Sequence, residues 1–315
     1  MNYLRKPSQP AYTLAICFVL ITLFITGCEE RDKACKKCNA DYRKEKKVRI
    51  IKHYDETSTL RETYYFYYYD QLLDSIEKFT HMEPSAKLKV EADVREVVRV
   101  YYPSKKCIPS YYEARTYVPA NPVELEKGIM SISGDVITNR HLAFYPDDML
   151  LVPDHTAEID YHYNGSDQVT IRSGTDYGLL VYPHPYGNEN YYTYTGDNIT
   201  EVSAWKEQAG YDLDKTFDNK NNPFSIQSGV MYYLTLIAYT DEEYFETICR
   251  DENNVTEMVY KGTDTSNSFV TITFSFTYSY DADDYPTKVA IYEVKEDEVY
   301  GDSETDHGTY RFEYY

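Results

Sequence analysis

The feature that most constrains the fold is a hairpin pattern: two aromatic residues in alternation, a short polar turn, and a segment rich in β-branched residues. It occurs four times, at Tyr67–Ile76, Tyr161–Ile171, Tyr192–Val202 and Tyr278–Val289. Aromatic and β-branched side chains favour strands, and Asp, Asn and Gly tolerate the positive φ of tight hairpin turns. The pattern therefore predicts an all-β chain in which successive strands pair as antiparallel hairpins.

The abundance of aromatic residues supports this interpretation, because the chain holds 37 Tyr and 12 Phe. Side chains spaced by two lie on one face of a strand. Residues 86–100 also read as a strand, since Leu88, Val90, Ala92 and Val94 alternate. The hairpin units are irregularly spaced, which predicts a large curved meander rather than a solenoid with a fixed period.

The N-terminus reads as a bacterial lipoprotein signal peptide. Arg5 and Lys6 precede an apolar run that ends in Ile25-Thr26-Gly27-Cys28. A basic n-region, an apolar h-region and small residues before a cleavage point define a secretory signal, and this run is too interrupted for a transmembrane helix. We expect residues 1–27 to be removed and Cys28 to carry the lipid, palmitate included.

After Cys28 we expect a lipid-anchored basic tether at residues 28–47 and a tyrosine-rich β domain at residues 48–315. Glu29, Glu30 and Asp32 resemble the acidic export tag of surface lipoproteins. This tag predicts an outer-membrane protein displayed on the cell surface, with a periplasm-facing orientation as the alternative. The chain carries 52 acidic and 32 basic residues, and this excess of acid argues against a nucleic-acid partner.

Cysteine usage predicts at most a disulfide in the tether. Cys35 and Cys38 have the spacing of a redox pair or of half a zinc site. A redox site would need a thioredoxin-like setting, and zinc would need a second matching pair. Neither is visible in the sequence, and an exported chain permits disulfides, so we interpret the two residues as a possible disulfide.

Recognisable catalytic motifs are lacking. The histidines show no paired metal spacing, and no nucleophile elbow, P-loop or dinucleotide fingerprint occurs. The acidic clusters at 218–222 and 281–284 suit either a calcium ion or a polar turn, and we favour the turn. The sequence thus predicts neither an enzyme nor a cofactor.

The hairpins, the stretch Phe217–Phe224 and the lipobox together resemble uncharacterised Bacteroidota lipoproteins with a porin-like fold. The resemblance covers roughly residues 48–315. It implies a large antiparallel sheet, a porin-like or partly open barrel, without an established activity. Residues 103–153 depart from the hairpin pattern and read as an insertion or as longer loops.

Two functions fit these observations best. The first is a surface binding or accessory module for glycan or protein, in which exposed aromatic side chains contact the partner. The candidate residues are Tyr64, Phe66, Tyr68, Tyr192, Tyr194 and Trp205. The second is a structural component of an envelope complex, docked through a sheet edge or face. A hydrolase with a dispersed site and a membrane-spanning barrel are further alternatives.

Overall fold

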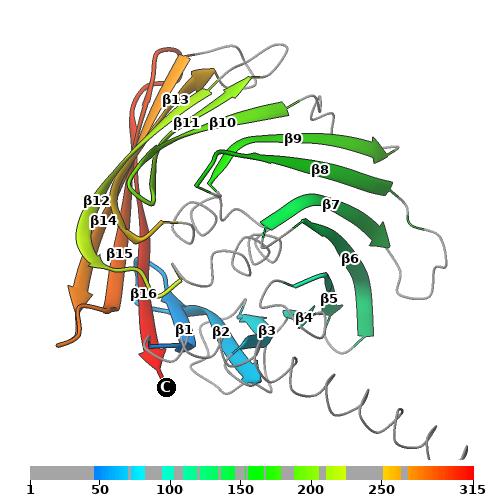
Figure 1. Cartoon of the computed structure of the whole chain (residues 1–315). Helices are drawn as coiled ribbons and strands as arrows, with labels where there is room; N and C mark the ends of the chain where they lie inside the picture. Colours follow the sequence, from blue (N-terminus) through cyan, green and yellow to red (C-terminus); the bar gives the residue numbers. More distant parts are fainter. Residues whose placement is uncertain are drawn as a thin grey trace, which may run out of the picture.

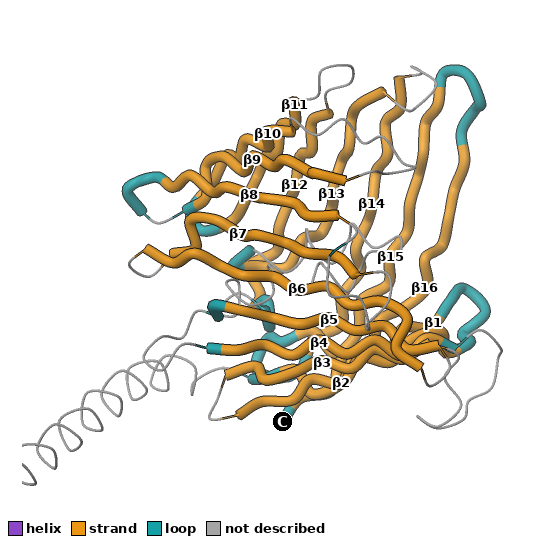
Figure 2. The backbone as a smooth tube through the Cα atoms, turned by 90° about the vertical axis from the view of Figure 1, so that its right-hand side faces the viewer, coloured by secondary structure: helices purple, strands orange, loops and turns teal. Residues whose placement is uncertain are grey.

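A computed structural model describes residues 46–69, 72–81, 94–102, 109–118, 121–133, 136–145, 153, 155–166, 168–178, 188–205, 211–224, 251–263 and 269–315. Sixteen antiparallel strands in sequence order close into one barrel, so the predicted all-β, porin-like fold is confirmed and the sheet closes fully (Figures 1 and 2). The strands are β1 (Val48–Tyr54), β2 (Leu60–Tyr69), β3 (Leu72–Thr80), β4 (Val94–Tyr101), β5 (Tyr111–Val118), β6 (Asn121–Ser133), β7 (Val136–Tyr145), β8 (His155–Tyr163), β9 (Val169–Gly178), β10 (Asn188–Thr195), β11 (Asn198–Trp205), β12 (Tyr211–Asn221), β13 (Asn253–Thr263), β14 (Phe269–Tyr280), β15 (Pro286–Asp297) and β16 (Ser303–Tyr314).

The barrel is closed by the pairing of the first strand with the last. Ile51 lies opposite Phe312, and His53 lies opposite Tyr310. Gly308 in β16 has φ of +79°, and a Cβ there would lie 2.8 Å from the backbone of Asp55. Only glycine combines this conformation with such a close approach. The sequence therefore provides a specific glycine where β16 passes the end of β1.

Residues 103–153 do not form an insertion. They contain β5, β6 and β7, which continue the barrel wall between β4 and β8. These strands lack the aromatic pair before a turn, which is the signal that identifies the other hairpins. The expectation of an insertion or longer loops was wrong, because these strands are marked only by the alternation of inward and outward side chains and not by the aromatic hairpin motif.

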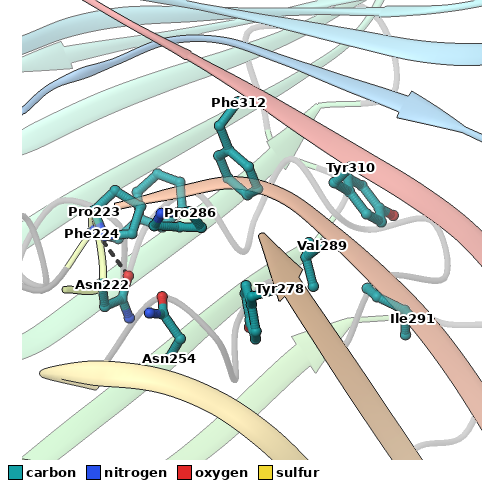
Figure 3. Close-up of a pocket in the computed structure, with 10 residues that line it drawn as sticks. All are labelled: Asn222, Pro223, Phe224, Asn254, Tyr278, Pro286, Val289, Ile291, Tyr310 and Phe312. Atoms are coloured by element: carbon teal, nitrogen blue, oxygen red, sulfur yellow. Dashed lines mark hydrogen bonds between the residues drawn. The ribbon is translucent and has the colours of Figure 1, made fainter. Parts of the chain in front are cut away.

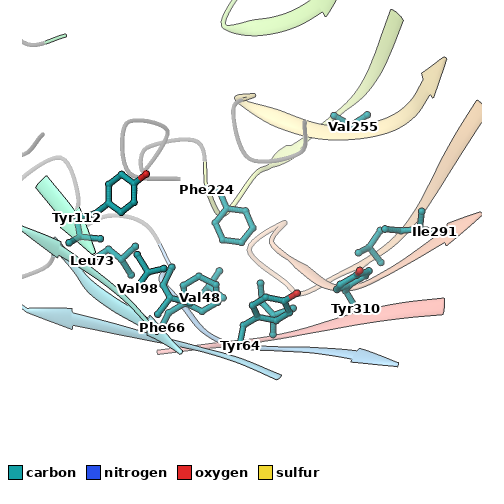
Figure 4. Close-up of a cluster of buried hydrophobic side chains, with 14 of the residues drawn as sticks. Val48, Tyr64, Phe66, Leu73, Val98, Tyr112, Phe224, Val255, Ile291 and Tyr310 are labelled. Atoms are coloured by element: carbon teal, nitrogen blue, oxygen red, sulfur yellow. The ribbon is translucent and has the colours of Figure 1, made fainter. Parts of the chain in front are cut away.

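The two faces of the wall differ in polarity. In β14, Phe274 and Phe276 are buried while Ser275 and Thr277 are exposed. The buried side chains face the barrel interior, as the position of Phe224 shows. Its ring, in the turn after β12, lies 6.3 Å from that of Phe66 on β2, although β12 and β2 are not neighbours. The contact therefore crosses the interior, and the core lines the inner face (Figure 4).

The core continues around much of the barrel through register-matched inner positions. Tyr112 on β5 is fully buried and lies opposite Gly128 on β6. A Cβ at Gly128 would lie 2.7 Å from Cδ1 of Tyr112 and would overlap other atoms of the ring. The tyrosine ring thus fills the space that the glycine leaves open. Close packing of this kind makes the inner face a solid core at this position.

Every second connection lies at the same end of an antiparallel barrel. The turns that follow β2, β8, β10 and β14 therefore share one end, which we call the hairpin-turn end. β1 begins and β16 ends there, and the Tyr315 amide donates a hydrogen bond of 3.1 Å to the Lys47 carbonyl. The repeated sequence pattern thus marks one end of the molecule, where the chain also enters the barrel.

Candidate functional site

The hairpin pattern places aromatic side chains on the inner face near the hairpin-turn end. This aromatic lining comprises Phe66 and Tyr68 on β2, Tyr161 and Tyr163 on β8, Tyr192 and Tyr194 on β10, Phe217 on β12, Tyr278 and Tyr280 on β14, and Phe312 and Tyr314 on β16. These strands all run toward that end, so the motif repeats at equivalent positions. Aromatic residues carry large buried areas, and the lining contributes to the core as well as to any interior binding surface.

The turn after β12 folds inward and fills part of this lining. The Asn222 side-chain oxygen accepts a hydrogen bond of 3.0 Å from the Phe224 amide, which shapes an Asx turn around Pro223. Phe224 is 1% exposed and packs 6.5 Å from the ring of Phe312. The cavity left beneath it, lined also by Tyr278 and Tyr310, has a volume of about 20 Å³ (Figure 3). Such a space is too small for a sugar or a cofactor.

A buried ion pair lies at the other end of the connection between β12 and β13, just before β13 begins. Asp251 is fully buried, and its carboxylate lies 2.7 Å from the Lys215 ammonium. It also accepts a hydrogen bond of 2.6 Å from the Ile199 amide. The Asn222 side chain donates to the Asp251 carbonyl at 2.9 Å. Ile199 belongs to β11, Lys215 to β12, and Asp251 precedes β13. The network therefore links these three neighbouring strands at the hairpin-turn end.

The acidic clusters act as turn acceptors. Asp218 accepts a hydrogen bond from the Tyr280 hydroxyl and another, of 2.9 Å, from the Lys220 amide. Burial raises the pKa of Tyr280, and the hydrogen bond to Asp218 adds to this rise. Asp281 accepts bonds from two amides of its own turn and pairs with Lys46 at 2.7 Å. The part of the chain that the structure describes shows no group of three acidic, His or Cys side chains suited to a metal ion.

A second polar cluster lies on the inner face near the barrel closure. The Glu62 carboxylate on β2 lies 3.0 Å from the Lys78 ammonium and accepts a hydrogen bond of 2.6 Å from the Tyr64 hydroxyl. His53 stacks on Tyr310 with ring centroids 4.2 Å apart, and its Nε2 donates to the His307 carbonyl at 2.9 Å. These contacts link β3, β2, β1 and β16. They satisfy charges inside the wall and tie the closing strands to their neighbours.

The structure separates the aromatic residues predicted to bind a partner. Tyr64 and Phe66 are 7% and 3% exposed and belong to the core. Tyr68, Tyr192 and Tyr194 are half-buried in the aromatic lining, and Trp205 ends β11. A binding role stays a prediction for these residues. Cys28, Cys35 and Cys38 lie outside the described residues.

The outer face divides into two chemically different walls. On the wall of β12–β15, most outward side chains are small, hydroxylated or charged, and Phe269 and Tyr292 are also exposed there. The exposed polar residues are Asp212, Asp214, Thr216, Glu257, Lys261, Ser275, Thr277, Ser279, Lys288 and Glu296. On the wall of β3–β6, aromatic and basic residues such as Arg99 and Tyr101 on β4 occupy many of the outward positions, together with Glu77 and Glu113. This second wall was not predicted from the sequence. Its signal in the sequence is that basic and aromatic residues are separated by two or four positions along each strand, which places them on one face. These residues are Arg95, Arg99 and Tyr101 on β4 and Tyr111, Arg115 and Tyr117 on β5.

Helices long and apolar enough to cross a membrane are absent from the residues that the structure describes. No family model matches the chain, and no curated protein matches it.

Comparison with solved structures supports the fold. The barrel resembles a porin-like protein from Bacteroides uniformis, with a TM-score of 0.51 and 12% sequence identity, over 85% of this chain and 96% of that one. A porin-like protein from Bacteroides vulgatus matches at 9% identity and a TM-score of 0.34, over 86% of this chain and 99% of that one. At this identity the first likeness shows a shared porin-like fold. Membership of the lipoprotein family stays a prediction.

Proposed function

We propose that the protein is an outer-membrane lipoprotein, anchored through Cys28, whose barrel stays in the aqueous phase and acts as a binding or accessory module for a glycan or a protein. The observation that carries this proposal is the polarity of the wall of β12–β15, where Phe274 and Phe276 face the interior and most exposed outward side chains are hydroxylated or charged. A barrel that spans a bilayer needs the opposite arrangement, with an apolar band facing the lipid.

The outward charges make the cost of insertion large. Arg99, Lys261 and Lys288 are exposed on the outer face of β4, β13 and β15. Each Arg or Lys on a lipid-facing position costs about 2 to 4 kcal/mol at the bilayer midplane. The described strands are 7 to 13 residues long, so their polarity rather than their length opposes insertion. Membrane attachment would then come from the lipid, and two or more acyl chains would make it durable.

Barrel closure also narrows how a partner would dock. A structural component could dock through a sheet edge, but the described strands close into a barrel that leaves none of them with a free edge. A partner would therefore meet a face or an end of the barrel. This favours a surface module over a component that extends its sheet into another protein.

The experiment is fractionation of cells that make the full-length chain with its own signal peptide. We expect the wild-type protein to incorporate a palmitate analogue and to sediment with membranes. Cys28→Ala blocks acylation and retains the uncleaved signal. A second variant therefore replaces residues 1–28 with the signal peptide of a soluble periplasmic protein, and we expect its barrel in the soluble fraction.

Cys35→Ser serves as the matched control, because it removes a thiol from the tether and leaves the lipobox intact. It should label and sediment as the wild type does. A barrel that resists extraction from membranes in the signal-exchanged variant would overturn the aqueous placement. Palmitate labelling of Cys28→Ala would overturn the assignment of the lipid to Cys28.

A further inference from the structure

We propose that the outer face of β3–β6 is a binding surface for an acidic polysaccharide. This inference rests on the proposed role of the barrel as a surface binding module, and it names the surface and the ligand class. The surface, called the basic aromatic wall, is formed by Arg95, Arg99 and Tyr101 on β4, Tyr111, Arg115 and Tyr117 on β5, and Lys127 and Ile129 on β6.

Strand register aligns the exposed rings of this wall. Tyr101 lies opposite Tyr111, and Tyr111 lies opposite Ile129, so the three side chains form one row across β4, β5 and β6. The ring centroids of Tyr101 and Tyr111 are 5.3 Å apart. Tyr101 is 43% exposed and Ile129 is 56% exposed. A row of this kind offers apolar faces to a flat, extended ligand such as a sugar chain.

The adjacent row carries the charge. Arg99 lies opposite Glu113, which lies opposite Lys127. The Glu113 carboxylate is already engaged, because it accepts a hydrogen bond of 2.6 Å from the Tyr111 hydroxyl and lies 3.5 Å from the Arg115 guanidinium. Arg99 and Lys127 have no carboxylate partner among the described residues, so their charges are available to an anion.

In a third row, contacts on several sides position the guanidinium of Arg95. Arg95 lies over the Phe79 ring at 5.9 Å and over the Tyr117 ring at 5.5 Å, and it pairs with Glu77 at 2.8 Å. Its side chain is still 42% exposed. Packing between two rings lowers the rotamer entropy that a ligand contact would cost, and Arg binds carboxylates with two parallel hydrogen bonds.

Charge complementarity selects an anionic ligand. The chain as a whole carries a net charge of −20, so a basic wall is an exception on this molecule. The outward residues of β8, β11 and β12 are acidic by contrast, with Glu158, Glu201 and Asp212 exposed. A sugar polymer bearing carboxylates meets both requirements of the basic aromatic wall, since it brings ring faces to the tyrosines and anions to Arg99 and Lys127.

The test measures binding of the mature lipidated protein, held in a nonionic detergent, to polygalacturonate and to the neutral polymer dextran. We expect polygalacturonate to bind about tenfold more tightly or better, and its affinity to fall as salt rises, since a charge-assisted hydrogen bond corresponds to a factor of this order. Arg99→Ala should weaken binding about tenfold, and Arg99→Lys should restore part of the loss. Tyr101→Ala should weaken binding to the same polymer at any salt concentration.

Lys288→Ala is the matched control, because it removes an exposed cation from the opposite wall and should leave the affinity unchanged. Circular dichroism and the Tm of each variant verify that the barrel is folded. Equal binding of dextran, an unchanged affinity in Arg99→Ala, or equally tight binding of duplex DNA would overturn the proposal. Because palmitate labelling and fractionation are independent readouts, failure here would leave the lipoprotein assignment standing.

Discussion

Replacing Gly128 with alanine tests the packing of the barrel wall at one defined contact. Tyr112 is fully buried on the neighbouring strand, and a Cβ at position 128 would overlap its ring. Two effects compete. Alanine restricts the unfolded chain and stabilises an unstrained site by about 0.4 to 1 kcal/mol, whereas overpacking costs about 1 to 3 kcal/mol. Since the overlap involves the body of a fully buried ring rather than the end of a flexible side chain, the second effect should prevail.

We therefore expect Gly128→Ala to lower the free energy of unfolding by about 1 to 2 kcal/mol. Urea denaturation of the purified protein, followed by far-ultraviolet circular dichroism, measures this change. Gly165→Ala is the control, because nothing lies within 4 Å of a Cβ at position 165. It should not show a loss from overpacking.

A double-mutant cycle provides the decisive comparison. Tyr112→Ala alone should cost about 3 to 5 kcal/mol, because it removes a buried aromatic ring. In that background the obstacle at position 128 is gone, so Gly128→Ala should become neutral or stabilising. The same destabilisation by Gly128→Ala with and without the ring would refute the reasoning, because its cost would then come from something other than Tyr112.

Three further perturbations test other parts of the barrel. Asp251→Ala should lower the free energy of unfolding, measured by urea denaturation, by about 3 to 5 kcal/mol, because it leaves the buried Lys215 cation without its carboxylate. Adding Lys215→Met should recover part of that loss, and no recovery would contradict the pairing. Hydrogen bonds led by the Thr57 side chain hold the pKa of Asp55 well below its usual range. The stability advantage over Asp55→Asn should therefore be complete above about pH 4 and shrink as the pH falls toward the folded-state pKa, and a pH-independent difference would count against it. Phe224→Ala should cost about 3 to 5 kcal/mol by emptying the space across the interior, and a smaller change than 1 kcal/mol, measured by Tm, would argue that this ring does not pack on the opposite wall.

The sequence was most informative where strand, turn and strand are adjacent in the chain. Tyr192 and Tyr194 predict a strand, the Gly196 turn follows, and β10 and β11 pair across it as expected. Such hairpins involve local contacts, so residue preferences suffice to find them. The same logic failed for β5–β7, where no aromatic pair precedes the turn and only the spacing of outward and inward residues carries the signal.

Barrel closure and the outer wall depend on contacts that local patterns do not encode. Ile51 and Phe312 are opposite each other only because every intervening strand pairs in register. In the same way, the row of Tyr101, Tyr111 and Ile129 arises from the registers of two strand pairs. A shift of one residue in either pair would turn these side chains to the opposite face. Predicting that surface from sequence would have required the registers first.

Alternation along a strand also leaves one ambiguity that only the closed barrel resolves. The residues of β14 place Phe274 and Phe276 on one face and Ser275 and Thr277 on the other, which suits a membrane strand if the aromatic face looks outward. Here Phe274 lies opposite the buried Met258, and the hydroxyl face is exposed. In β14, the apolar face is therefore used inside the barrel and is unavailable to lipid. Under the proposed function, a lipid on Cys28 would hold the barrel at a membrane without any change to the outer wall. The outer wall would then be free to meet partners from the aqueous side, where Arg99 and Tyr101 are exposed.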